Sequence, residues 1–170
     1  MISSMPMKKQ IQKSQKFKTN FYHLNKGGFF IPLKPMKNEI YKHLKFKIGE
    51  ESCKYEFRLF PEEDYCCKKY CYDVYLFDKE KDENLFGIKV NKILLYYNAD
   101  VLTKIDYYFN PKLYTQLKVW ISQFLGSPYR EIKDDNIHSL SWYIGNHYMI
   151  LKILSNEKVM VLSHLKRKNI

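Results

Sequence analysis

A chain of 170 residues has the usual size of one domain, and 45% hydrophobic residues supply enough apolar side chains for a core. This composition excludes a disordered chain, which combines low hydrophobicity with high charge. The formal net charge of +11 makes a polyanion or an anionic membrane surface the first partner to consider.

The basic residues are concentrated at the two ends of the chain. Residues 1–20 and residues 166–170 contain no acid, so the residues between them carry only about +3. Only three of the 29 basic residues are Arg, the side chain suited to bidentate phosphate binding, which favours a solvated basic surface over a nucleic-acid site. If a polyanion is bound, the candidate contacts are Lys8, Lys9, Lys13, Lys16, Lys18, Lys166, Arg167 and Lys168.

The chain is expected to contain one folded domain. Residues 1–20 predict a flexible basic arm, residues 21–165 a single α+β domain, and residues 166–170 a basic tail. No run approaches the ~20 apolar residues of a membrane-spanning helix. Because the basic N-terminal residues are not followed by an apolar segment, they do not predict a secretory signal, and we expect a cytoplasmic protein.

The first part of the domain predicts a loop and then a hairpin. Gly27 and Gly28, with two prolines after them, indicate a loop or short hairpin over 21–35. Apolar and charged residues alternate over 41–48 and again over 53–59, which is the period of half-buried strands. The two runs, separated by a polar turn, predict an antiparallel pair.

The middle of the chain predicts one short helix and three strands. Pro61 suits a first helical position, acids follow it, and lysines come near residue 69, so a short helix over 61–69 is expected. Strands are expected over 70–77, over 85–97 with a bulge at Gly87, and over 101–109.

The clearest local pattern predicts a helix at about residues 111–125. Asn110 is a favoured N-cap and Pro111 suits the first helical position. Gly126 occupies the place of a left-handed C-terminal residue, and Pro128 prevents continuation. One apolar stripe recurs at the helical period: Leu113, Leu117, Trp120, Ile121 and Phe124.

The C-terminal third predicts a three-strand meander over 140–144, 147–154 and 158–162, with tight turns between the strands. The predicted fold class is therefore α+β. It is a mostly antiparallel sheet, built from hairpins and a C-terminal meander, with the helix at 111–125 packed on one face.

The cysteines are the first candidates for chemistry: Cys53, Cys66, Cys67 and Cys71. In a cytoplasmic protein they are expected to be reduced thiols, and Cys53 falls on the apolar face of its predicted strand. A zinc site is disfavoured because no second pair with ligand spacing accompanies Cys67 and Cys71. Reactive thiols near two lysines would instead make the protein a thiol-dependent enzyme.

The other polar groups have simpler explanations. The five histidines are scattered without a ligand or triad spacing, and we expect surface or hydrogen-bonding roles for them. The acids at 62–64 are explained by a first helical turn. Gly27 and Gly28 lack the context of a phosphate loop. We therefore expect no catalytic residue, no metal and no cofactor.

Tyrosines on the predicted strands indicate a contact surface. Tyr gives large contact area at low entropic cost, and it also stacks on single-stranded bases. Adjacent residues of a strand point to opposite faces, so one of each adjacent pair is expected outside. The candidate partner-binding residues are Tyr96, Tyr97, Tyr107, Tyr108, Tyr143 and Tyr148.

These patterns favour a non-catalytic protein-interaction module, such as a small bacterial inhibitor or immunity-type protein, that binds another protein through an aromatic sheet face. Two alternatives remain open. One is a nucleic-acid-associated protein that uses the Lys-rich termini. The other is a thiol-dependent enzyme that uses Cys66, Cys67 or Cys71.

Overall fold

The computed structural model describes residues 22–24, 30–32, 39–67, 70–78, 83–154, 156 and 158–166. The chain divides into two units, Met1–Lys34 and Pro35–Ile170. In the first unit, strands β1 (Tyr22–Leu24) and β2 (Phe30–Pro32) form an antiparallel pair. The second unit holds the sheet and the helix described below.

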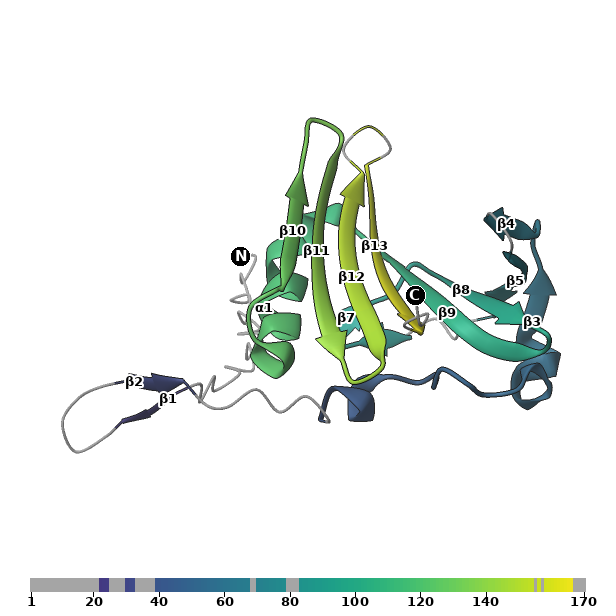
Figure 1. The fold of residues 1–170 in the computed structure, drawn as a ribbon, viewed down its shortest axis with the longest axis horizontal. Coiled ribbons are helices and arrows are strands. Elements are labelled where there is room, and N and C mark those ends of the chain that lie inside the picture. Colours follow the sequence, from purple (N-terminus) through teal and green to yellow (C-terminus); the bar gives the residue numbers. More distant parts are fainter. Residues whose placement is uncertain are drawn as a thin grey trace, which may run out of the picture. The chain divides into compact units, whose positions relative to one another are not determined.

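The second unit is built on a nine-stranded antiparallel sheet in the order β10-β11-β12-β13-β9-β8-β5-β3, with β4 paired to β5. Figure 1 shows β10 to β13 side by side, with β9 and β8 continuing toward β5 and β3. This arrangement confirms the predicted α+β class with hairpins and a C-terminal meander. The strands are β3 (Leu59–Pro61), β4 (Tyr65–Cys67), β5 (Tyr70–Phe77), β8 (Lys92–Asn98), β9 (Val101–Phe109), β10 (Arg130–Lys133), β11 (Ile137–Ile144), β12 (His147–Leu154) and β13 (Val159–Lys166).

The predicted helix at 111–125 is confirmed. A 3₁₀ turn, η3 (Pro111–Leu113), leads directly into α1 (Tyr114–Leu125). The Asn110 side chain accepts a hydrogen bond from the Lys112 N–H, and Gly126 ends the helix at a φ of 79°. The Trp142 indole N–H donates to the Gly126 carbonyl at 2.9 Å, which fastens the end of α1 to β11.

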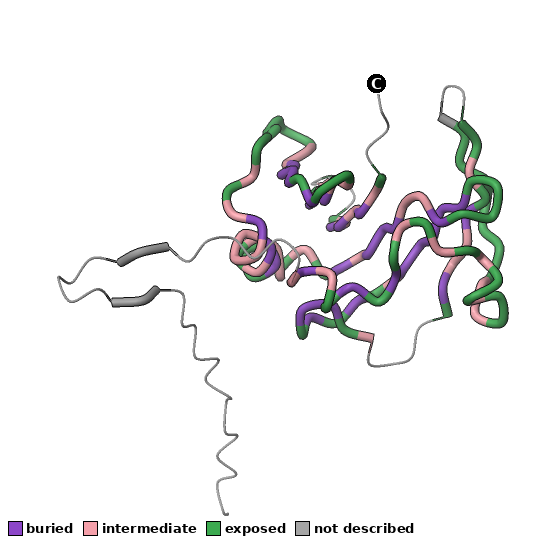
Figure 2. The backbone as a smooth tube through the Cα atoms, turned by 60° about the horizontal axis from the view of Figure 1, so that its bottom comes forward, coloured by how far each residue is buried: buried purple, intermediate pink, exposed green. Residues whose placement is uncertain are grey.

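The main core lies between α1 and one face of the sheet. The helix contributes Leu117, Ile121 and Leu125, and strands contribute residues such as Trp142 and Tyr107. The short helix η1 (Glu39–His43) and the β6 (Asn84–Leu85)–β7 (Ile88–Lys89) hairpin close the same side. Figure 2 shows buried segments along the strands and the helix, with exposed turns between them. We call this side of the sheet the core face.

The predicted hairpin over 41–59 is wrong, and its burial pattern holds only over 44–48, because Cys53 and Phe57 are exposed. Phe46 is buried while Lys45 and Lys47 are exposed, but the chain here is η1, an irregular segment and a second 3₁₀ helix, η2 (Ser52–Arg58). The Gly49 N–H donates to the Leu102 carbonyl, so the backbone bonds go to β9 and not to a hairpin partner. Alternating burial reports which side chains face the core, and it does not specify what the backbone pairs with.

The predicted short helix over 61–69 is also wrong. Pro61 ends the edge strand β3, a position where a missing N–H is tolerated, and 65–67 form β4, which pairs with the start of β5. Residues 68 and 69 lie outside the described part. The predicted strand over 85–97 is divided, because Phe86 and Gly87 both have positive φ and form the tight turn between β6 and β7.

No helix in the described part of the chain is both long and apolar enough to cross a membrane.

Candidate functional site: the outer face of the sheet

The strand register defines a second face of the sheet, opposite α1, which we call the outer face. Directly paired residues share a face, so each row of pairs can be followed across the strands. The first row is Tyr143, Tyr148, Leu165, Lys104 and Tyr96. The second is Arg130, Ser141, Ile150, Ser163, Asp106, Leu94 and Leu76. The third is Ile132, Ser139, Lys152, Val161, Tyr108 and Lys92.

Four of the six predicted tyrosines lie on this face: Tyr96, Tyr108, Tyr143 and Tyr148. The other two are in the main core, where Tyr97 is 1% exposed and Tyr107 is 2% exposed. Each adjacent pair on β8 and β9 therefore divides between the faces, as the strand period requires. Tyr97 and Tyr107 are buried too deeply to belong to a contact surface.

An exposed aromatic cluster occupies the β10–β12 end of the outer face. The rings of Tyr129 and Tyr143 are stacked with centroids 3.8 Å apart, and Tyr148 lies 5.0 Å from Tyr143. Tyr129 is 46% exposed and Tyr143 is 37% exposed. Sequence reasoning missed Tyr129, because it precedes β10 in a loop and carries no strand periodicity. Its N–H donates to the Ser141 carbonyl, and this bond holds it beside β11.

Aliphatic side chains occupy the middle of the outer face. Ile150, Val161 and Leu165 are half-buried, and Ile132 at the β10 edge is exposed. A smaller apolar cluster of Val74, Leu94 and Tyr96 continues the surface toward β5, and every residue recorded in it belongs to the sheet's own strands. The outer face therefore carries apolar side chains from β10 to β5 among its polar ones, and no helix from the described part of the chain packs over them.

A polar cluster is set into this surface around Asp106, which is 4% exposed. Its carboxylate accepts hydrogen bonds from Ser163 Oγ at 2.6 Å and from the Tyr96 hydroxyl at 2.9 Å, and Lys104 Nζ lies 2.7 Å away. Burial, and next the charge of Asp106, raises the pKa of Tyr96 far above its usual value, so the phenol stays protonated and donates. Three donors compensate the buried carboxylate.

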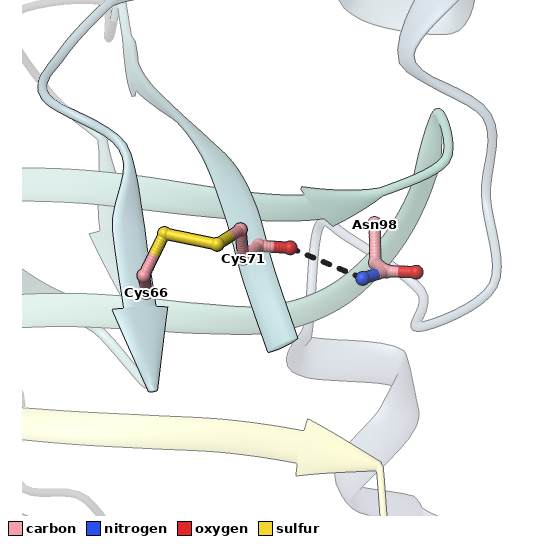
Figure 3. The surroundings of a disulfide bond; sticks show 3 residues. All are labelled: Cys66, Cys71 and Asn98. Carbon is pink, nitrogen blue, oxygen red and sulfur yellow. Dashed lines mark hydrogen bonds between the residues drawn. A yellow bond between two sulfur atoms is a disulfide. The ribbon is translucent and has the colours of Figure 1, made fainter. Parts of the chain in front are cut away.

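The β4 hairpin borders the other end of the outer face. The Tyr65 ring stacks on Tyr72 with centroids 6.2 Å apart and meets the Tyr96 ring edge-on at 6.1 Å. A disulfide joins Cys66 and Cys71, which are directly paired across β4 and β5. Figure 3 shows this bridge, with the Asn98 amide directed at the Cys71 carbonyl, to which it donates at 3.1 Å.

The disulfide overturns the prediction that all the cysteines are reduced thiols. Cys66 and Cys71 are bonded to each other, so in this form neither offers the thiolate that a thiol-dependent enzyme requires. Cys53 is a free thiol, and its predicted place on the apolar face of a strand is wrong. It is exposed on η2. The side chain of Cys67 lies outside the described residues.

A pocket of about 650 Å³ lies beside η2, on residues outside the outer face. Its lining includes Cys53 and the carboxylates of Glu51, Glu56 and Asp100. The Cys53 thiol is 3.7 Å from a Glu51 oxygen. No imidazole is among its lining residues, so the pocket lacks the Cys–His pairing that activates many nucleophilic cysteines.

The four histidines of the second unit lie apart from the outer face. His164 is fully buried on the core face, and its Nε2 lies 3.3 Å from His147 Nδ1. His138 Nε2 lies 2.7 Å from a Glu131 carboxylate oxygen, and His43 packs on Phe124. Among the described residues, no group of three or more His, Cys, Asp or Glu side chains has an arrangement that could hold a metal ion.

The remaining predicted residues divide between the described and undescribed parts of the chain. The acids at 62–64 are exposed between β3 and β4, where Glu62 pairs with Lys92 at 3.1 Å, and they are not in a helical turn. Lys166 is exposed at the end of β13. The other candidate polyanion contacts lie outside the described residues: Lys8, Lys9, Lys13, Lys16, Lys18, Arg167 and Lys168.

Comparison of the chain with protein-family models, with curated proteins and with solved structures found no match, so any function assigned to the outer face rests on its geometry.

Proposed function

We propose that this chain is a non-catalytic protein-interaction module that binds another protein through the outer face of its sheet. The observation that carries the proposal is the aromatic cluster on the side opposite α1, formed by the exposed Tyr129 and Tyr143 and the half-buried Tyr148. Stable interfaces concentrate their binding energy in aromatic anchors surrounded by apolar contacts. The half-buried Ile150 and Leu165 beside these tyrosines supply such a surround.

A protein partner fits the composition of this face better than a nucleic acid does. Single-stranded bases need aromatic platforms along a groove of cations that follows the phosphates. Here the middle of the face is aliphatic, with Ile150, Val161 and Leu165 in neighbouring strands. Aliphatic groups gain free energy by meeting apolar protein surface, at about 25 cal/mol per Å² removed from water.

The proposal is tested by matched capture from cells of the source organism. The full chain, Tyr143→Asp and Ile150→Asp are immobilised beside Val119→Asp, a control that places the same charge on an exposed aliphatic position of α1. A captured protein is identified, purified and titrated against each variant. Loss of an aromatic or apolar anchor is expected to weaken binding by about 2 kcal/mol or more, about 30-fold in Kd.

Circular dichroism checks that each variant is folded, and Tyr143→Asp remains informative if the half-buried Ile150→Asp unfolds. The proposal fails if the purified protein binds both outer-face variants as tightly as it binds the control. It also fails if no purified candidate binds the full chain.

A further inference from the structure

Basic side chains outnumber acidic ones on the outer face. The three rows of paired residues contain four basic side chains (Lys92, Lys104, Arg130 and Lys152) and one acid, Asp106. Asp106 is buried and bound to Lys104, Tyr96 and Ser163, so it presents little negative charge outward. Lys92 is paired with Glu62 at the margin.

Arg130 and Lys152 are the two cations that this arrangement leaves for a partner. Both are exposed, and neither takes part in an ion pair within the described part of the chain. They lie on β10 and β12 with β11 between them, which separates their backbones by about 10 Å. Ile150 lies two residues from Lys152 on β12 and is paired with Ser141, the cross-strand partner of Arg130.

An apolar partner surface would cover these cations without compensating them. Taking an unpaired charge out of water is strongly unfavourable, and a carboxylate at hydrogen-bond distance recovers much of that cost. A second copy of the chain, docked by the same face, would bring Arg130 and Lys152 near their own counterparts. The charge pattern therefore disfavours face-to-face self-association.

We infer that the protein partner of the outer face presents an acidic surface, with carboxylates placed around the apolar residues that contact Tyr143 and Ile150. Complementary charge then sets the orientation and the rate of association, while the apolar centre supplies most of the affinity. This inference rests on the proposed function and adds the chemistry of the partner to it.

The test uses a random copolymer of glutamate and tyrosine as the probe and the full chain as the receptor. Because the lysines of residues 1–20 attract any polyanion, the readout must identify residues, and NMR of labelled methyl groups at Ile150, Val161 and Leu165 does so. Titration of the copolymer is expected to shift these methyl resonances, and added salt should weaken the effect.

Matched charge reversals separate a local site from general attraction. Arg130→Glu with Lys152→Glu is compared with Lys89→Glu and Lys112→Glu, which change the net charge equally at exposed positions outside the outer face. The outer-face pair should weaken the copolymer titration about 10-fold or more, and the control pair about 2-fold or less.

Three results would overturn the inference. The first is that the copolymer leaves the three methyl resonances unshifted. The second is that both pairs of charge reversals weaken copolymer binding equally. The third is that oligothymidylate binds more tightly than the copolymer at the same methyl groups. The inference and the proposed function fail separately. A purified partner that requires Ile150 but tolerates the outer-face reversals supports the interaction module and removes the acidic partner.

Discussion

At the scale of single residues, neighbouring tyrosines differ by the face on which they fall. The hydroxyl of Tyr96 donates to Asp106, whereas the buried hydroxyls of Tyr97 and Tyr107 have no hydrogen-bond partner among the described residues. Tyr107 was predicted to contact a partner, but it shares its strand face with Ile105 and Phe109, and all three are buried. The unbroken apolar run before Asn98 does not indicate which of Tyr96 and Tyr97 is buried, and the register shifts between them.

This difference predicts opposite effects of removing a hydroxyl. Tyr107→Phe should leave the free energy of unfolding unchanged or raise it by about 1 kcal/mol, because an unpaired buried hydroxyl is a cost to the fold. Tyr96→Phe should lower it by about 1.5–3 kcal/mol, because a hydrogen bond to a buried carboxylate is lost. Urea denaturation of the two variants measures both values. A clear loss of stability in Tyr107→Phe would show that its hydroxyl has a partner.

At the scale of elements, α1 forms in agreement with its local sequence signals, whereas the β4–β5 hairpin forms against them. The helix follows from signals within a few residues of its ends, such as Asn110 and Gly126, and these were readable from the sequence. The hairpin forms where helical signals surround Pro61. Pairing of β4 with β5 and the bond between Cys66 and Cys71 outweigh those weak local preferences.

The contribution of the disulfide can be measured directly. Because Cys66 and Cys71 are only five residues apart, the bond closes a short loop, and its loss should lower the free energy of unfolding by about 2 kcal/mol. The variant Cys66→Ser with Cys71→Ser tests this by denaturant unfolding. Cys53→Ser is the control, since that thiol is exposed and should change stability by about 0.5 kcal/mol or less. An equal effect of the two variants would contradict the expected role of the bridge.

At the scale of the whole second unit, the two faces of the sheet have different functions in the fold. The core face is closed by α1, η1 and the β6–β7 hairpin, and it carries the main core. The outer face carries exposed tyrosines, aliphatic residues and cations. The main core therefore lies on one side of the sheet, and we propose the other side as the surface for a partner.

The core face also predicts how global stability depends on pH. Tyr41 of η1, His147 of β12 and His164 of β13 meet there, with the Tyr41 hydroxyl 3.4 Å from His147 Nδ1. Burial, and next the nearby His147, lowers the pKa of His164 to about 3. Burial, and next Lys166, lowers the pKa of His147. The folded protein therefore holds both imidazoles neutral at pH values where the unfolded chain binds protons.

The direction in which the free energy of unfolding changes with pH follows from this difference in proton binding. His164 contributes its full stability above its unfolded pKa of about 6.5, and this contribution is lost as the pH falls toward 3. The loss should approach about 1.4 kcal/mol per pH unit while His164 remains neutral in the fold. Denaturant unfolding from about pH 7 to about pH 5 should show a flatter dependence for His164→Leu than for the unchanged chain. His43→Gln is a control at an exposed ring, and a slope unaffected by His164→Leu would refute the assignment.

Local sequence was sufficient for the α+β class, the helix at 111–125 and the strands of the C-terminal meander, because caps, turns and periodicity act over a few residues. It did not reveal the pairing of β13 with β9, the disulfide, the irregular path over 44–58 or the position of Tyr129. The β13–β9 pairing and the path over 44–58 depend on residues far apart in the chain, and strand pairing is governed mainly by such neighbours. Tyr129 is positioned by its contact with β11. Cys66 and Cys71 are close in the chain, but four cysteines leave the choice of pairing open. The tyrosines suggested a contact surface, but only the tertiary structure placed Tyr97 and Tyr107 in the core and set Asp106 among its donors on the opposite face.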